Sequence, residues 1–353
     1  MIYVNEKWLA RIRIYHQKQP ISVKNIIVLS ERIVIYGLMN SKIENNVVKR
    51  QEAAFGKAFN EKLQTLRAVV IGVGGTGSPM AILLARSGIG ELILLDGDNL
   101  DITNMNRVSG FSNEDIGKNK AIALKDYIDT LGLNTKVIAI PEYLHISETG
   151  IDALSSSDIV FCCTDDATGR DIINQALYYY SLVLIDVGLT GFVDRETKSE
   201  PFLRDHRGRV SCVFPENGAC LRCQNVINDK MIEYEEAVRQ NPDLLKLDPE
   251  TLLKEHYLIG GGEQAPGVGP FTTITAMNGL ATFMNLIHEF RDLSSDFRND
   301  NIWIDFIHLT IYSNYPQNEN DECIYCKRRS LLLKKEEIYR LDMPSLGAIP
   351  NED

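Results

Sequence analysis

The stretch RAVVIGVGGTGSPMAILLARSGIGELILLDGD (residues 67–98) sets the architecture, because an apolar run, a glycine-rich turn, a helical pattern and a second apolar run follow one another in it. We expect a strand over residues 67–72, a turn over 72–77, a helix over about 77–87 and a strand over 91–96. Buried strands that alternate with helices are typical of a parallel sheet covered on both faces. The stretch therefore predicts an α/β protein with a Rossmann-like, doubly wound, mostly parallel sheet.

The same alternation continues through the chain. It predicts strands over 135–144, 157–165 and 182–191, and helices over 118–132, 167–180 and 270–290. Residues 50–66 favour one helix or two short helical turns. Residues 1–49 alternate apolar and polar side chains over short runs, which indicates a small β-rich segment.

These patterns divide the chain into an N-terminal segment (1–49), a core domain (50–327) and a C-terminal tail (328–353). Residues 225–262 interrupt the core, because they are highly charged, contain two prolines and end in three glycines. We expect a mobile helical insertion there, either a lid over a bound peptide or a solvated surface feature.

Composition excludes several classes of protein. The 353 residues carry 37 Lys and Arg against 48 Asp and Glu, a formal net charge of −11, so no positive field is left for nucleic acid or an anionic membrane surface. No apolar run reaches the roughly 18 residues that a membrane span needs. Charged residues interrupt the apolar stretch at the start of the chain, unlike a signal peptide. We expect a cytoplasmic protein.

Four of the seven cysteines form two C-x2-C pairs: Cys220 with Cys223, and Cys323 with Cys326. Such pairs predict a tetrahedral zinc site, which here would join segments about 100 residues apart. Four cysteine ligands leave no open position, so the zinc would be structural; the alternative is four unrelated thiols. The apolar run around Cys162 and Cys163 indicates buried strand residues, and Cys212 stands alone.

The glycine-rich turn favours a nucleotide. Its glycines would let the backbone approach a phosphate, and the following helix would supply free N–H groups. Asp96 ends the next strand, 19 residues after Gly77, where a carboxylate can accept hydrogen bonds from a ribose. Close packing of the helix on the strand would require similar glycines, and a dinucleotide would fit equally well. The glycines concerned are Gly72, Gly74, Gly75 and Gly77.

The residues after Asp96 favour a triphosphate. Asn104, Arg107 and Lys120 follow the strand end, and a triphosphate that is cleaved needs several such groups, whereas a dinucleotide needs few. Asp165, at the end of the expected strand 157–165, could hold Mg2+ near the same phosphates. Each residue alone could equally be a solvated surface group.

Together these motifs resemble the ThiF/MoeB/HesA superfamily, which is related to the ubiquitin-activating enzymes. The match runs from about residue 50 to 290, and the cysteine pairs extend it to Cys326. It rests on GVGGTG, LLDGDNLDITNMNR, GKNKA, CTDD, CLRC and CIYC. The resemblance implies an ATP- and Mg2+-dependent enzyme, commonly a homodimer, that adenylates a carboxylate.

The resemblance also implies roles for individual residues. Asp96 would bind the ribose, with Asp98 also at the nucleotide. Asp165 would hold Mg2+. Arg50 resembles an arginine finger that reaches the phosphates of the neighbouring subunit, although an ordinary arginine at a helix start is the alternative. The residues that would bind and polarise the phosphates are Asn104, Arg107 and Lys120.

One departure from the pattern bears on the substrate. Residues 224–270 contain no cysteine, whereas superfamily members that form a thioester carry one before the apolar helix. Members without this cysteine include enzymes that modify ribosomally made peptides, such as those of microcin C and pantocin A maturation. Those enzymes often hold a leader peptide in an N-terminal β-rich clamp, which residues 1–49 could form; a dimer arm is the alternative.

The favoured hypothesis is adenylation of a carboxylate on a precursor peptide, with capture of the acyl-adenylate by ring formation or nucleotidyl transfer. The alternative substrate is the C-terminus of a ubiquitin-like or sulfur-carrier protein. A nicotinamide-dependent enzyme is disfavoured by Arg107 and Lys120, and a non-catalytic nucleotide-binding scaffold remains a fourth hypothesis.

Overall fold

The computed structural model describes the core of the chain and the backbone of several N-terminal strands. Side chains and backbone are described for most of residues 47–194, 200–215, 218–247, 249–256, 267–291 and 301–313, and for Cys323, Tyr325 and Cys326. The expected C-terminal tail (328–353) and part of the insertion, residues 248 and 257–262, lie outside the described residues.

An eight-stranded sheet forms the centre of the described region, in the order β13-β12-β11-β10-β9-β6-β7-β8. Five neighbouring strands are parallel, as the sequence predicts: β6 (Arg67–Ile71), β7 (Glu91–Leu95), β8 (Lys136–Ile140), β9 (Ile159–Cys162) and the start of β10 (Val183–Asp194). Three antiparallel strands extend the sheet: β11 (Phe202–Val213), β12 (Asn301–Asp305) and β13 (Thr310–Ser313).

The parallel strands lie in the order β8-β7-β6-β9-β10, so successive crossovers run outward in both directions from the boundary between β6 and β9. Ligands of doubly wound sheets bind at such a switch point, beyond the carboxyl ends of the strands. The glycine-rich turn follows β6 and the CTDD motif follows β9. The fold therefore brings these two motifs together.

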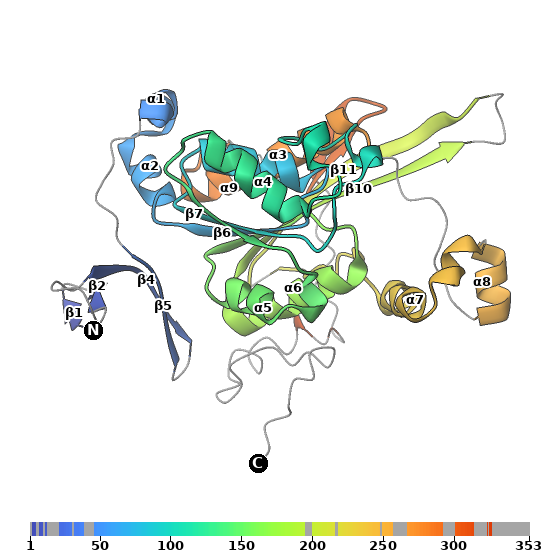
Figure 1. The fold of residues 1–353 in the computed structure, drawn as a ribbon, viewed down its shortest axis with the longest axis horizontal. Helices are drawn as coiled ribbons and strands as arrows, with labels where there is room; N and C mark the ends of the chain where they lie inside the picture. The colour runs from blue at the N-terminus through green and yellow to red at the C-terminus, as the bar shows by residue number, and fades with distance from the viewer. Residues whose placement is uncertain are drawn as a thin grey trace, which may run out of the picture.

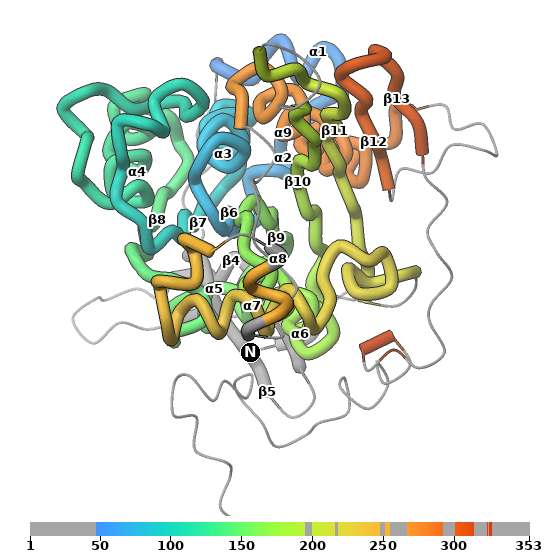
Figure 2. The backbone as a smooth tube through the Cα atoms, turned by 90° about the vertical axis from the view of Figure 1, so that its right-hand side faces the viewer, coloured from blue at the N-terminus to red at the C-terminus, as the bar shows by residue number. Residues whose placement is uncertain are grey.

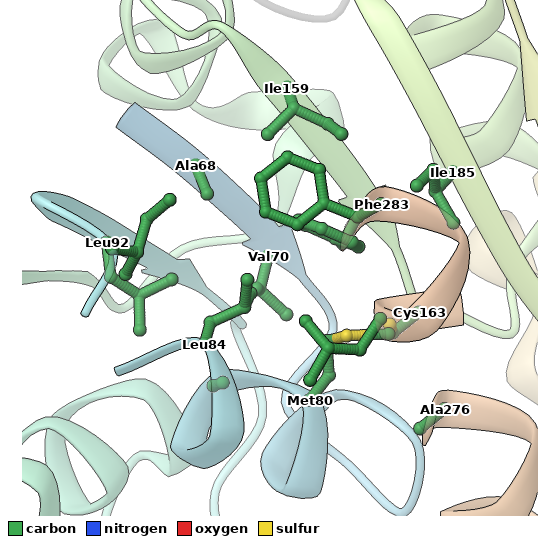
Figure 3. Close-up of a cluster of buried hydrophobic side chains, with 14 of the residues drawn as sticks. Ala68, Val70, Met80, Leu84, Leu92, Ile159, Cys163, Ile185, Ala276 and Phe283 are labelled. Carbon is green, nitrogen blue, oxygen red and sulfur yellow. The ribbon is translucent and has the colours of Figure 1, made fainter. Parts of the chain in front are cut away.

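Helices cover both faces of the sheet, as Figure 1 shows. One face carries α3 (Gly77–Arg86), α4 (Lys120–Thr130) and α9 (Gly269–Ile287), and the other α5 (Glu148–Ser155) and α6 (Ala167–Tyr180). Figure 3 shows the core on the α3 side, with Phe283 of α9 among its side chains. The Phe283 ring meets the Phe161 ring edge-on, with 5.4 Å between centroids. Burial of these apolar side chains supplies most of the driving force for folding.

The remaining helices are short. Residues 50–66 form two helices, α1 (Lys49–Phe55) and α2 (Lys57–Leu63), which Gly56 separates with a φ of +83°. The insertion contains α7 (Asp229–Gln240) and α8 (Pro249–His256), so its helical character is confirmed. The 3-10 turns are η1 (Asn46–Val48), η2 (Ile102–Asn104), η3 (Asn113–Asp115), η4 (Leu144–Ile146) and η5 (Pro242–Lys246). Within the described residues, no helix combines the length and apolarity needed to cross a lipid bilayer.

The backbone of the N-terminal segment is β-rich, as expected. Its longest strands pair in an antiparallel hairpin. The strands are β1 (Ile2–Val4), β2 (Lys7–Leu9), β3 (Arg11–Ile12), β4 (Ile21–Leu29) and β5 (Arg32–Leu38).

Three expectations need correction. The strand expected over 135–144 covers only Lys136–Ile140, and a 3-10 turn follows at Leu144–Ile146. The strand expected over 157–165 ends at Cys162, because the Asp166 side chain accepts a hydrogen bond from the Gly169 N–H (2.6 Å) and caps α6. The strand expected over 182–191 continues to Asp194 and pairs antiparallel with β11. Asp165 therefore lies in a loop beyond the strand rather than on the strand itself.

Candidate nucleotide and zinc sites

The glycine-rich turn is tightly packed against the end of β9. A Cβ added at Gly72, whose φ is +79°, would lie 2.8 Å from the Cys163 carbonyl oxygen, and one at Gly77 would lie 1.8 Å from the Gly72 oxygen. A Cβ at Gly74 would meet nothing within 4 Å. Gly72 and Gly77 thus serve close packing, and Gly74 leaves open space where a phosphate could approach the backbone.

Asp96 lies at the end of β7, beside the turn. Its carboxylate accepts hydrogen bonds from the Val73 N–H (2.8 Å) and the Asp98 N–H (2.9 Å), which fixes its orientation. Burial raises the pKa of Asp96, while the Lys120 charge and these two hydrogen bonds oppose the rise. Each carboxylate oxygen retains a lone pair that could accept a ribose hydroxyl.

Lys120 begins α4, and its ammonium group lies 2.8 Å from Oδ2 of Asp98. Asn119 caps this helix by accepting from the Ala121 and Ile122 N–H groups, and its amide donates to the Asp96 carbonyl oxygen (2.9 Å). The helix start is therefore tied to the end of β7. The structure brings Lys120, Asp98 and Asp96 together at one sheet edge.

Arg107 lies against the glycine-rich turn. A Cβ added at Gly75 would be 3.2 Å from Arg107 Cγ, and one at Gly267 would be 2.8 Å from Arg107 Cδ. The guanidinium donates to the Thr103 carbonyl oxygen (2.8 Å) and to the Asn106 side-chain oxygen (3.0 Å). The cation is thus held next to the turn, between it and the start of α9.

Asn104 is engaged in a cap. Its side-chain oxygen accepts from the Asp101 N–H (3.2 Å), and the Asp101 carboxylate accepts from the Thr103 N–H (2.8 Å). The side-chain amide group of Asn104, which is half-buried, is the part that could donate to a phosphate.

Asp165 is exposed, in the loop between β9 and α6. Its neighbours Thr164 and Asp166 are hydrogen-bonded to each other through their side chains. An exposed carboxylate near the glycine-rich turn is available to a divalent cation. Nothing else in the described region forms a cluster of three such ligands with it.

Arg50 is not brought to this edge within its own chain. It is exposed on α1, and the adjacent Gln51 donates to the carbonyl oxygen of Ser87, the C-cap of α3 (3.0 Å). The glycine-rich turn lies at the other end of α3, about 15 Å away for a helix of ten residues. A role of Arg50 at the phosphates would therefore require a second chain, and an ordinary arginine at the start of a helix remains the alternative.

The four cysteines of the C-x2-C pairs converge and are all buried, with their Sγ atoms within 4.8 Å of one another. Cys220 and Cys323 Sγ lie 3.7 Å apart, and Cys223 and Cys326 Sγ lie 3.6 Å apart. Four thiolates at about 2.3 Å from one zinc ion stand about 3.8 Å apart. The cysteines therefore fit a tetrahedral zinc ion, with no position open for a substrate.

The family model for the ThiF family matches residues 48–323, well over half of the sequence. The chain belongs to the ThiF family.

Two curated ThiF-like relatives illustrate the match. The chain is 33% identical over 291 residues, 79% of its own length and 54% of the relative, to the adenylyltransferase and sulfurtransferase UBA4 of Debaryomyces hansenii. It is 31% identical over 157 residues, 44% of its length and 61% of the relative, to the sulfur carrier protein ThiS adenylyltransferase of Escherichia coli. The chain spans about half the length of several curated relatives that it matches.

Among solved structures, E. coli MccB with MccA-N7isoAsn has a TM-score of 0.60 and 22% identity, and the match covers 80% of this chain and 75% of that chain. MccB is described as a microcin C7 biosynthetic enzyme. This similarity shows a common ThiF-type fold.

The sequence did not single out a buried charge cluster at the same edge of the ThiF core. Asp186 on β10 is fully buried and accepts from Arg170 Nε (3.0 Å) and Arg209 Nη2 (2.6 Å). Burial raises the pKa of Asp186, but the charges of Arg209 and Arg170 outweigh it and hold that pKa below its usual range. Both arginines are thus paired with one carboxylate, and the Asp166 charge also acts on Arg170.

Tyr143, Asn119 and Glu235 were also missed. Tyr143 donates to the Asp98 carboxylate, and Asn119 donates to the Asp96 carbonyl oxygen. Glu235, in the insertion, accepts from the Ala167 N–H at the start of α6. Only Asn119 had a signal in the sequence, because it lies within GKNKA.

Proposed function

We propose that this protein is an ATP- and Mg2+-dependent enzyme that adenylates a carboxylate on a ribosomally made precursor peptide. The main support is one sheet edge of a ThiF-family chain. There the glycine-rich turn, with open space at Gly74, lies together with Asp96, Lys120 and Arg107. The two ThiF-like relatives with the identities given above are both named adenylyltransferases.

A peptide substrate is favoured over a carrier protein by two observations. The chain aligns over 80% of its length with MccB, which was solved with a peptide derived from MccA. Residues 224–270 also lack the cysteine that a thioester relay requires. The alternative substrate is the C-terminus of a ubiquitin-like or sulfur-carrier protein, which the ThiS adenylyltransferase and UBA4 relatives support.

In the proposed reaction, a carboxylate oxygen of the peptide attacks the α-phosphorus of ATP. The bond from that phosphorus to the bridging oxygen breaks, and pyrophosphate leaves with the electron pair. Lys120, Arg107 and the Asn104 amide stabilise the charge on the phosphate oxygens, each contributing a few kcal/mol. Asp165 would hold Mg2+, which supplies further charge neutralisation. No general base is required, because a carboxylate is already nucleophilic at neutral pH.

A nucleophile of the same peptide then captures the acyl-adenylate. Attack of an amide or amine on the activated carbonyl would expel AMP and close a ring, with net loss of water from the peptide. An amide nitrogen of the peptide could instead attack the phosphorus of the acyl-adenylate. The bond from phosphorus to the carboxylate oxygen then breaks, the carboxylate leaves with the electron pair, the nitrogen gives its proton to solvent, and a nucleotidyl peptide results. We further propose a homodimer in which Arg50 reaches the partner's phosphates, with residues 1–49 as a leader-peptide clamp or a dimer arm.

The test is ATP–pyrophosphate exchange with short peptides and, separately, with a carrier protein ending in Gly-Gly. We expect exchange with peptides, and we expect Lys120→Ala to lower its rate by at least 100-fold, because the lysine stabilises charge that develops on the phosphates. Lys125→Ala is the matched control, since Lys125 lies on the same helix but pairs with the surface residue Asp129.

Exchange by Lys120→Ala at the wild-type rate would refute the phosphate assignment. Exchange with the carrier protein alone would favour the alternative substrate, and exchange with neither would count against adenylation.

A further inference from the structure

One tyrosine at the candidate nucleotide site has no part in the proposed mechanism, yet it contacts residues that do. Tyr143 follows β8, and its hydroxyl donates to Oδ1 of Asp98 (2.6 Å). The other oxygen of the same carboxylate accepts from Lys120 Nζ (2.8 Å). Asp98 therefore bridges Tyr143 and the lysine proposed to bind the phosphates.

The Tyr143 ring packs on the backbone of the loop that follows β7. A Cβ added at Gly97 would lie 2.5 Å from Tyr143 Cγ and 2.6 Å from Cδ2, so the ring rests directly on this glycine. The φ of Gly97 lies outside the left-handed region, so a glycine is needed there for space rather than for backbone conformation. The His145 ring lies 5.7 Å from the Tyr143 ring between centroids, at 31° between the planes. Tyr143 nevertheless remains 46% exposed.

The hydrogen bond persists over the physiological pH range. The hydrogen bond to Asp98, together with burial, raises the pKa of Tyr143 to about 12, so the hydroxyl stays a donor. Burial raises the pKa of Asp98, but the hydrogen bonds from Lys120 and Tyr143 outweigh this effect and lower it overall. Asp98 thus stays an anion held between two donors.

The order of the strands says which part of a nucleotide would meet this ring. β7 lies between β6 and β8 in the sheet. A nucleotide with its phosphates at the turn after β6 and its ribose at Asp96 after β7 would, if it continued in the same direction, place its base at the loop after β8. Tyr143 lies in that loop, and every nucleobase has a face that can stack on an aromatic ring.

We propose that Tyr143 is a positioning residue with two functions: its ring receives the base of a nucleoside triphosphate, and its hydroxyl fixes Lys120 through Asp98. The inference rests on the proposed function, because it assumes that the triphosphate lies at the glycine-rich turn. It adds a physical link between the base end and the phosphate end of the site. A base bound against the Tyr143 ring would thereby affect the position of Lys120, which stabilises the reacting phosphates.

Two variants separate the ring from the hydroxyl. Tyr143→Leu removes both, and Tyr143→Phe keeps the ring but removes the donor to Asp98. Binding of ATP and of inorganic tripolyphosphate, which has no base, is measured by calorimetry, and kcat and KM for ATP are measured by pyrophosphate exchange. Tyr127→Phe, two turns along α4 from Lys120, is the matched control and is expected to behave as wild type.

We expect Tyr143→Leu to weaken ATP binding roughly tenfold, the typical effect of losing one base–aromatic stack, with tripolyphosphate binding changed much less. Tyr143→Phe should bind ATP within about threefold of wild type but lower kcat several-fold, since an Asp98 without its second donor holds the Lys120 charge more tightly.

An equal loss of ATP and tripolyphosphate binding in Tyr143→Leu would overturn the base assignment, as would unchanged ATP binding. Wild-type kcat in Tyr143→Phe would overturn the link to Lys120. Wild-type protein that binds neither ATP nor tripolyphosphate would refute the proposed function itself, which distinguishes the two failures.

Discussion

The His206 side chain is a buried imidazole without a hydrogen-bond partner among the described residues. Its ring packs against Phe271 (4.7 Å between centroids) and Phe306 (5.8 Å). A Cβ added at Gly191, its partner across the β10–β11 pairing, would crowd Nδ1 at 2.4 Å, so this glycine makes the space for the ring. Burial lowers the pKa of His206, with the Asp205 charge opposing, and the imidazole is therefore neutral at neutral pH.

This residue should contribute to acid sensitivity. Its folded-state pKa lies below the unfolded value of about 6.5, so the unfolded chain binds the proton more readily as the pH falls. The stability that neutral His206 provides is complete above about pH 6.5 and is lost as the pH falls below that value. We expect His206→Phe to reduce the fall in Tm between pH 7 and pH 5 by about 2 °C relative to wild type.

The measurement is thermal unfolding at half-unit pH steps. Leu245→Ala is the control, because Leu245 is exposed and has no titratable side chain, so the difference between pH 7 and pH 5 should stay as in wild type. An unchanged pH dependence in His206→Phe would show that other groups cause the acid sensitivity.

At the scale of elements, a helix of the insertion caps a helix of the core. Figure 2 shows α7 beside α6, and Glu235 on α7 accepts from the Ala167 N–H (2.5 Å) and the Thr168 N–H (2.8 Å) at the start of α6. Arg239, one turn further on α7, contacts the Thr168 hydroxyl (3.2 Å). A carboxylate at this end of a helix satisfies donors that have no intrahelical partner and interacts favourably with the helix dipole.

Removing this carboxylate should loosen the loop that carries Asp165. We expect Glu235→Ala to cost about 1–2 kcal/mol locally, as the loss of a helix cap does, and to speed hydrogen exchange over residues 164–170 by roughly 5- to 30-fold. Hydrogen exchange with mass spectrometry measures this directly. Glu236→Ala is the control, because the neighbouring Glu236 is exposed; equal exchange in both variants would show that the cap does not stabilise α6.

The elements that the sequence predicted are those whose character is local. β6, β7 and α3 each carry an apolar run or a helical pattern between clear turns, and all three were predicted with small boundary errors. β11 was missed because its sequence, FLRDHRGRVSCV, contains four charged residues and resembles a loop.

Two of the arginines of β11 pair with carboxylates on β10, whereas Arg207 pairs with Asp205 within β11 (2.9 Å). Arg204 pairs with Asp194 (2.9 Å) and Arg209 with Asp186 (2.6 Å). The same reason explains why the sequence did not single out Tyr143: its contacts are with Asp98 and Gly97, 45 and 46 residues earlier in the chain. Motif residues were predictable, but residues that act through long-range contacts were not.

At the scale of the whole molecule, the cysteine cluster closes a long segment of chain. Cys220 and Cys323 are separated by 103 residues, which include the insertion, α9, β12 and β13. The cluster belongs to the same buried core as α6, and the Tyr178 hydroxyl lies 3.5 Å from Cys326 Sγ. A zinc ion at this point would hold the end of the chain's core region onto α6 and would favour the folded state by its binding free energy.

We therefore expect the purified protein to contain one zinc ion and Cys323→Ser to lose most of it. Three remaining thiolates bind zinc more weakly, and without the ion the buried sulfur atoms gain no attraction to offset their loss of solvation. The Tm should fall by roughly 10 °C, since structural zinc sites contribute several kcal/mol to folding. Metal content by mass spectrometry and thermal unfolding are measured on the same samples.

Cys212→Ser is the matched control, because Cys212 is buried but not part of the cluster, and it should retain the zinc. A Cys323→Ser protein without zinc but with the wild-type Tm would show that the four cysteines converge for packing rather than to hold a metal.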